Sequence, residues 1–202
     1  MCVRHGADIV GFVVDYPRPV PWNLSVQRAG ELIKSAPDSA KTCVVTGGQT
    51  DKILRIAREI MPDYLQLHYG ETLEDTVYTC ERLGELGIRV IKALSPDLPD
   101  LEQAAAKFSA AGIYALLLDP RTPDNAAGHA GTADFAAYEK VKRAASCPVI
   151  LAGGITPANV REAIIQTGAP VIDLMTGVES SPGVKDEATV VELFGALPKR
   201  NT

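Results

Sequence analysis

The chain has 202 residues, of which 46% are hydrophobic and 22% are charged, a composition typical of a globular protein with a sizeable core. Its formal net charge of −5 argues against a nucleic-acid-binding surface, because such a surface needs clustered lysine and arginine. No apolar run reaches the ~18 residues that span a bilayer, and no signal peptide precedes the first apolar run. We therefore expect a cytoplasmic protein of one domain, residues 1–202, that binds neither nucleic acid nor membrane.

Seven short apolar runs alternate with amphipathic stretches along the chain, the pattern of a parallel sheet with helical crossovers. The runs are continuously hydrophobic, which indicates strands buried on both faces. We expect these strands at residues 8–14, 42–46, 64–68, 88–93, 113–118, 149–152 and 171–175.

The stretches between the runs carry helix start and stop signals. The residues expected to cap helices are Thr50, Asp100, Asp134 and Thr156, the last followed by a proline. The glycines expected just past helix ends, where a left-handed backbone is favoured, are Gly87, Gly112 and Gly168.

Seven such units, ending in a helix at residues 185–197, fit either a doubly wound sheet or a (βα)8 barrel that lacks one strand. The first strand-to-helix turn has no GxGxxG, so the barrel is favoured. The opening stretch "MCVRHGADIVGF" then reads as the tail of helix 1 ending at Gly6, with strand 1 and most of helix 1 absent from the printed chain. Either a segment of roughly 20–25 residues precedes Met1, or the protein begins there with an open sheet that favours self-association; we expect a monomer or a homodimer.

The last two strand-to-helix loops predict a phosphate site, which in barrels of this kind forms after strands 7 and 8. Gly153 and Gly154 let backbone N–H groups approach an anion closely, beside the helix start at Thr156. Thr176 and Gly177 supply a second set of donors. The alternative is that these glycines only form tight turns, but two such loops at the expected positions favour a phosphorylated small molecule as ligand.

The sequence resembles the phosphoribosylanthranilate isomerase family of tryptophan biosynthesis, whose members are (βα)8 barrels. The resemblance is carried by five segments: "GADIVGFVVDYPRPV", "LQLHYGE", "LLLDP", "AGGITPANV" and "DLMTGVESSPGVKD". It implies a TIM-type barrel of the phosphate-binding kind and an isomerase without metal or cofactor. The reaction implied is an Amadori rearrangement of N-(5-phosphoribosyl)anthranilate to 1-(2-carboxyphenylamino)-1-deoxyribulose 5-phosphate.

The resemblance also implies roles for individual residues. Asp119 matches the family's general acid, although from its position alone it could equally order the loop of residues 120–133 or cap a helix. Arg18 matches the arginine that holds the anthranilate carboxylate; the alternative is a solvated loop arginine. Asp173, in the last apolar strand, is expected to contact a substrate hydroxyl or a structural hydrogen-bond partner. Gln66 and His68 alternate onto the same side of their strand, where His68 is either a substrate contact or a satisfied core histidine.

One element of the family pattern is missing from the printed sequence. The family's general base is a cysteine in a Lys-x-Cys-Gly motif on strand 1, and neither Cys2 nor Cys43 stands in that motif. Two alternatives to the isomerase therefore stay open. One is a catalytically impaired barrel that still binds sugar phosphates, and the other is an isomerase or epimerase of the same superfamily that acts on another sugar phosphate.

Overall fold

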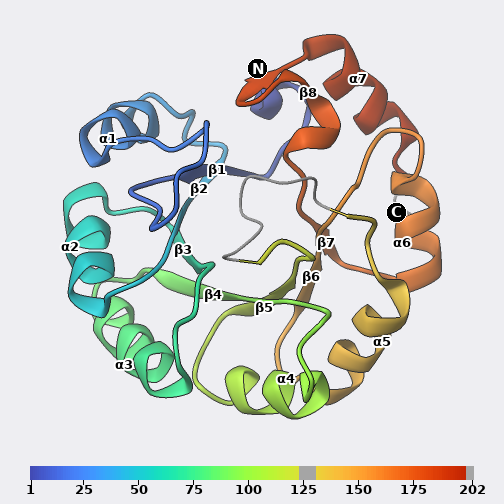
Figure 1. Cartoon of the computed structure of the whole chain (residues 1–202). Helices are drawn as coiled ribbons and strands as arrows, with labels where there is room; N and C mark the ends of the chain where they lie inside the picture. Colours follow the sequence, from blue (N-terminus) through green and yellow to red (C-terminus); the bar gives the residue numbers. More distant parts are fainter. Residues whose placement is uncertain (123–130, 199–202) are drawn as a thin grey trace.

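A single curled sheet of parallel strands forms the centre of the molecule, seen in a computed structural model that describes residues 1–122 and 131–198 (Figure 1). Its strands follow one another in chain order, each paired in parallel with the next. They are β1 (Ile9–Val13), β2 (Lys41–Thr46), β3 (Tyr64–Leu67), β4 (Arg89–Leu94), β5 (Ala115–Leu118), β6 (Val149–Leu151) and β7 (Val171–Ile172). All seven predicted strands are thus confirmed, and the chain has the (βα) barrel architecture.

Helices form a ring outside the strands (Figure 1). They are α1 (Val26–Lys34), α2 (Thr50–Ile60), α3 (Leu73–Gly84), α4 (Leu101–Ser109), α5 (Phe135–Ala144), α6 (Val160–Thr167) and α7 (Glu187–Ala196). Short 3-10 helices lie at η1 (Cys2–His5) and η3 (Thr176–Val178), and a hairpin of β8 (Glu179–Ser181) and β9 (Val184–Lys185) precedes α7. None of the helices within the described ranges is long and apolar enough to cross a membrane.

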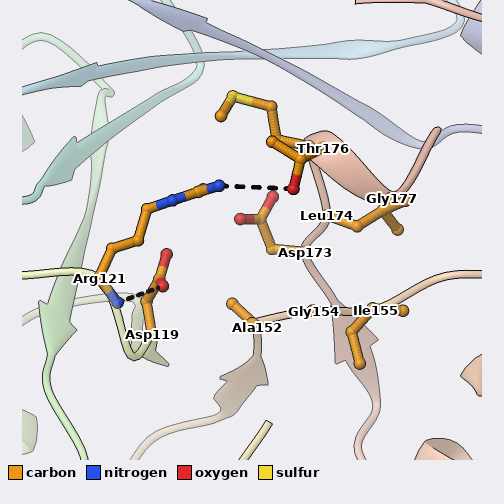
Figure 2. A pocket seen from close by; sticks show the side chains of 11 residues that line it. Asp119, Arg121, Ala152, Gly154, Ile155, Asp173, Leu174, Thr176 and Gly177 are labelled. Carbon is orange, nitrogen blue, oxygen red and sulfur yellow. Dashed lines mark hydrogen bonds between the residues drawn. The ribbon is translucent and has the colours of Figure 1, made fainter. Parts of the chain in front are cut away.

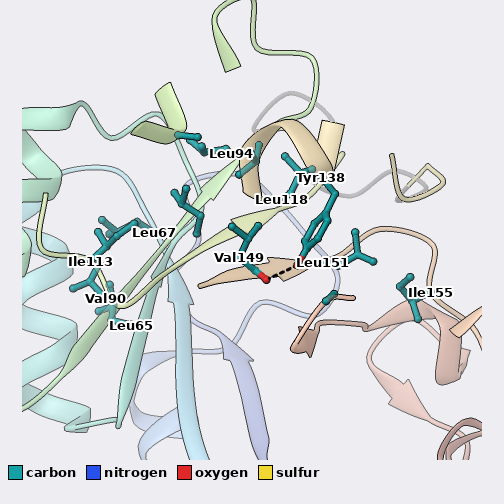
Figure 3. Close-up of a cluster of buried hydrophobic side chains, with 14 of the residues drawn as sticks. Leu65, Leu67, Val90, Leu94, Ile113, Leu118, Tyr138, Val149, Leu151 and Ile155 are labelled. Atoms are coloured by element: carbon teal, nitrogen blue, oxygen red, sulfur yellow. Dashed lines mark hydrogen bonds between the residues drawn. The ribbon is translucent and has the colours of Figure 1, made fainter. Parts of the chain in front are cut away.

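The sheet separates two apolar cores, as expected for strands buried on both faces. Inside the barrel, alternate strand residues pack together, among them Cys43, Tyr64, Ile91, Leu117 and Ile150. Outside, the larger core lies between the sheet and the helices (Figure 3). There the fully buried Tyr138 of α5 donates a hydrogen bond from its hydroxyl to the carbonyl of Val149, 3.0 Å away, which ties the helix to β6.

The opening residues form a short helical segment that ends at Gly6, as predicted. Gly6 has a φ of 114°, in the left-handed region that favours glycine, and turns the chain into β1. The segment lies beside α7 (Figure 1), where Arg4 and His5 contact the carboxylate of Glu187. Within the described residues, β1 and β7 each pair on one side only and form the two edges of the sheet.

Two of the predicted helix caps are wrong. Thr50 is the first residue of α2 rather than its cap, and its hydroxyl bonds to the Asp75 carboxylate instead. Helix α6 begins at Val160, not after Thr156, because the Asn159 side chain accepts a hydrogen bond from the Thr156 amide and holds a separate turn there.

The remaining start and stop signals agree better with the structure. Asp134 caps α5 by accepting a bond from the Ala137 amide, whereas Asp100 occupies the cap position of α4 without a side-chain cap bond. The three glycines predicted past helix ends all have positive φ: Gly87, Gly112 and Gly168.

Candidate active site

The candidate site lies at the carboxyl ends of the strands, where backbone hydrogen bonds continue past the last strand residue. The Asp119 amide donates to the carbonyl of Leu94, and the Asp173 amide donates to the carbonyl of Leu151. The His68 amide bonds to the carbonyl of Thr46 in the same way. These bonds fix the backbone of all three residues although each follows its strand, so their side chains start from rigid positions.

Asp119 and His68 are in direct contact across the barrel interior. Nε2 of His68 lies 3.2 Å from Oδ2 of Asp119, and an ionised carboxylate only accepts hydrogen bonds, so the ring nitrogen donates. The other oxygen, Oδ1, accepts a 2.9 Å bond from the Arg121 amide. Asp119 is only 5% exposed. The carboxylate therefore orders the start of the loop that follows β5, as one alternative predicted, and residues 123–130 of that loop lie outside the described residues.

His68 is itself held from a neighbouring loop. The hydroxyl of Tyr16, after β1, donates a 2.6 Å bond to the His68 carbonyl, and the two rings meet edge to face. Burial and the nearby Glu71 carboxylate raise the pKa of Tyr16 to about 12, so the hydroxyl keeps its proton and remains a donor. His68 thus has well-defined partners in the free protein, as expected of a satisfied core histidine, while its ring points at the candidate acid.

The two carboxyl groups of the site have opposite electrostatic surroundings. Burial alone raises the pKa of Asp119, but the hydrogen bond and charge of His68 and the amide and guanidinium of Arg121 outweigh it and hold that pKa below its ordinary value. The Asp173 side chain is exposed to water at the mouth of the barrel, yet the many protein atoms around it reduce its hydration and raise its pKa, and the Asp119 carboxylate adds to this. In the free protein Asp119 therefore gives up its proton more readily than Asp173 does.

The two glycine-containing loops meet over one pocket (Figure 2). Gly153 and Gly154 have φ values of 97° and 58°, and a Cβ on Gly154 would lie 2.3 Å from the carbonyl oxygen of Gly131. A Cβ on Gly177 would lie 1.8 Å from the carbonyl oxygen of Ile155. Glycine at position 154 lets the loop after β6 approach the loop after β5, and glycine at position 177 lets the loop after β7 approach the loop after β6, which is more than a tight turn demands.

The pocket brings together most of the predicted site residues. Its lining includes Asp119 and Asp173 and all four predicted phosphate ligands, which are Gly153, Gly154, Thr176 and Gly177. Gln66 is buried on β3 in the same inward-facing row as Tyr64, as alternation predicted, but it does not line the pocket. Arg18 is exposed on the loop after β1 and is likewise not part of the lining.

Two features of the site were missed from the sequence. Arg121 lines the pocket, and its Nη2 reaches to 3.5 Å from the hydroxyl of Thr176. Lys92 and Glu71 form an ion pair with a 2.7 Å contact, and their side chains are 3% and 0% exposed. A lysine inside the apolar run of β4 was the available signal for the second feature, since a charge is rarely buried without a partner.

Cys43 does not take part in the pocket. It lies in the interior core on β2, opposite Tyr64 in the register, and is 4% exposed. Burial raises the pKa of its thiol far above the ordinary value, and the Asp173 carboxylate adds to the effect. Among the described residues, no group of three or more histidine, cysteine, aspartate and glutamate side chains is placed to hold a metal ion.

Comparison with known proteins agrees with this geometry. A family model described as N-(5'phosphoribosyl)anthranilate (PRA) isomerase matches residues 12–196. An N-(5'-phosphoribosyl)anthranilate isomerase of Haloferax volcanii is 38% identical over 186 residues, which cover 92% of this chain and 80% of the relative. The solved phosphoribosyl anthranilate isomerase of Thermotoga maritima is similar with a TM-score of 0.79 at 28% identity, covering 96% of this chain and 90% of that one.

A second solved isomerase was determined in complex with reduced 1-(o-carboxyphenylamino)-1-deoxyribulose 5-phosphate. It has a TM-score of 0.77 at 27% identity and covers 96% of this chain and 89% of that one. The fold, the paired glycine loops and the long sequence match lead to the same assignment. This chain belongs to the phosphoribosylanthranilate isomerase family.

Proposed function

We propose that this protein catalyses the Amadori rearrangement of N-(5-phosphoribosyl)anthranilate to 1-(2-carboxyphenylamino)-1-deoxyribulose 5-phosphate, a step of tryptophan biosynthesis. The observation that carries the proposal is that Asp119 and the two glycine loops line one and the same pocket. This pocket joins a proton-transfer group to a set of backbone anion donors, the two things that acid-base chemistry on a phosphorylated sugar requires.

In the proposed reaction the backbone N–H groups of the two loops bind the phosphate and position the sugar at the strand ends. Asp119 gives a proton to the ring oxygen, the bond from that oxygen to C1 breaks, and the nitrogen lone pair forms a C1–N double bond. A base then removes the C2 proton, and the resulting enol rearranges to the ketone.

To act as an acid, Asp119 must first be protonated in the complex. Its pKa is low in the free protein because of His68 and Arg121. A phosphate dianion bound in the same pocket opposes the effect of the Arg121 guanidinium and shifts the pKa of Asp119 upward. Substrate binding and acid function are thus linked in the proposal.

Arg18 is proposed to hold the anthranilate carboxylate from the loop after β1. Pro17 and Pro19 on either side of it restrict the backbone, and an exposed guanidinium has the planar geometry for a bidentate contact with a carboxylate. Gln66 and Asp173 are proposed as further substrate contacts at the strand ends, and His68 is proposed to act on the substrate through Asp119.

One observation favours a second candidate, a barrel that binds sugar phosphates but turns them over poorly. The Cys43 thiol does not line the pocket and burial raises its pKa, so among the described residues it is poorly suited as a thiolate base. Such a protein keeps the phosphate loops without a thiolate base.

Complementation of a tryptophan auxotroph that lacks this isomerase separates the two candidates. Growth with the wild-type gene, and none with Asp119→Asn, supports the isomerase. Binding of the reduced product analogue by a protein that gives no growth supports the second candidate. A gene extended by its in-frame upstream codons is tested in parallel, and growth with that version alone assigns the base to the upstream segment.

A further inference from the structure

Arg121 extends across the mouth of the pocket and touches three loops. Its amide binds Asp119 at the end of β5, and its Nη2 lies 3.5 Å from Oγ1 of Thr176 in the loop after β7. Its guanidinium carbon lies 5.7 Å from the ring centroid of Trp22, in the loop after β1. Figure 2 shows the side chain reaching over the pocket to Thr176, with the carboxyl of Asp173 beside this contact.

The charges that line the pocket require a cation for an anionic ligand to bind. Asp119 and Asp173 both contribute carboxyl groups to the lining. Arg121 supplies the one cationic side chain among the described lining residues, since the two loops contribute backbone N–H groups without net charge. A phosphate dianion placed over the glycine loops meets two carboxyls, and Arg121 is positioned to offset their repulsion.

The guanidinium of Arg121 also has an N–H donor without a partner among the described residues. Within the described part of the chain its Nε atom is buried and has no hydrogen-bond partner, and the contact with Thr176 is at the long limit for a hydrogen bond. A buried charged donor without an acceptor is costly. The Nε–H and Nη–H groups on one edge of a guanidinium match two oxygens of a phosphate, the bidentate geometry for which arginine is suited.

We propose that Arg121 is the cationic ligand of the substrate phosphate, closing over the group from the side opposite the backbone donors of Gly153–Gly154 and Thr176–Gly177. This inference rests on the proposed function for the identity of the phosphorylated ligand. Trp22 packs against the guanidinium and holds it at the pocket mouth. The side chain of Arg121 therefore connects the phosphate site to the loop after β1, which also carries Arg18.

The test measures the affinities for inorganic phosphate and for anthranilate separately, by titration calorimetry on wild type, Arg121→Gln and Arg121→Lys. Loss of a charge-assisted bidentate contact is expected to weaken phosphate binding in Arg121→Gln by about ten- to a hundredfold and to leave anthranilate binding unchanged. Arg121→Lys keeps the charge and is expected to recover part of the phosphate affinity. In turnover, Arg121→Gln is expected to raise KM more than it lowers kcat.

Two controls make the result specific. Arg143→Gln removes the same charge from the exposed outer surface of α5 and is expected to bind phosphate like wild type. Arg18→Gln is expected to lose anthranilate affinity while keeping phosphate affinity. Thermal melting checks that each variant is folded. If Arg121→Gln is not folded, the phosphate affinity of Arg121→Lys is compared with that of Arg143→Gln, and a weaker affinity in Arg121→Lys supports the proposal whereas equal affinities overturn it.

The proposal is overturned if Arg121→Gln binds inorganic phosphate as wild type does, if it loses anthranilate affinity instead, or if the wild type binds no phosphate. Phosphate affinity is read without turnover. A protein that binds phosphate through Arg121 but converts no substrate therefore contradicts the isomerase and not this inference.

Discussion

Replacing Lys92 by methionine is expected to destabilise the fold by about 3–5 kcal/mol, because it leaves a buried carboxylate without its ion-pair partner. Nζ of Lys92 donates to Oε2 of Glu71 at 2.7 Å and to the carbonyl of Tyr69 at 3.2 Å. The Glu71 side chain has no exposed surface. Methionine has a similar length and fills the space of the aliphatic stem, so the loss reports the charge rather than a cavity.

The remaining bonds of Glu71 place the expected loss near the lower end of that range. The amides of Gly48 and Tyr69 donate to its two oxygens at 3.0 and 3.2 Å, and both bonds survive the substitution. Because Glu71 joins the loops after β2 and β3 to β4, the loss falls on the strand ends that carry His68. Adding Glu71→Gln to Lys92→Met removes the buried charge and is expected to recover about half of the lost stability.

Urea unfolding followed by circular dichroism measures these differences. Arg28→Met is the matched control, since Arg28 pairs with Glu31 on the exposed face of α1 and such pairs contribute little. The control is expected to have the same urea midpoint of unfolding as wild type. If Lys92→Met also has the wild-type midpoint, or if the double variant is no more stable than Lys92→Met, the buried pair does not hold the loops together as described.

Three further predictions concern the pocket and the barrel interior. Gly177→Ala is expected to abolish inorganic phosphate binding, because its Cβ would meet the Ile155 carbonyl oxygen at 1.8 Å. Gly195→Ala on α7 has open space around its Cβ and should bind phosphate normally, and titration calorimetry compares the phosphate affinities of the two variants. Asp173→Asn is expected to raise the melting temperature at pH 7. The raised pKa of Asp173 means that ionisation costs folded-state stability, a cost that disappears as the pH falls and both states become protonated. Equal melting temperatures from pH 4 to 8 would contradict this. Cys43→Ala should retain wild-type turnover, and a folded variant without turnover would make the thiol part of the reaction.

The strands were predictable because hydrophobic burial on both faces leaves continuous apolar runs in the sequence. The start of α6 was not, because the side chain of Asn159 holds a turn at Thr156, where the sequence shows only a good cap followed by proline. The β8–β9 hairpin was also missed. Its strands are short and half exposed, and Gly183, with a φ of 82°, was its clearest signal.

The candidate site was predictable where local sequence determines it and not where it depends on distant contacts. Gly153 and Gly154 form a glycine pair directly after an apolar run, and Asp119 directly follows a strand, so each could be placed from the sequence. Arg121 meets Thr176 from 55 positions away, and Lys92 meets Glu71 from 21. The pairing of β3 with β4 brings Lys92 to Glu71, and the curvature of the sheet brings Arg121 to Thr176; no local sequence pattern records either contact.

The most direct test of the assignment is conversion of N-(5-phosphoribosyl)anthranilate by the purified protein, followed through the absorbance and fluorescence of the anthranilate ring. Wild type is expected to convert the substrate, and Asp119→Asn is expected to lower kcat by about a hundred- to ten-thousandfold while binding the reduced product analogue nearly as tightly. Equal turnover by Asp119→Asn and wild type would contradict the assignment of Asp119 as the acid, and analogue binding without any wild-type turnover would contradict the isomerase itself.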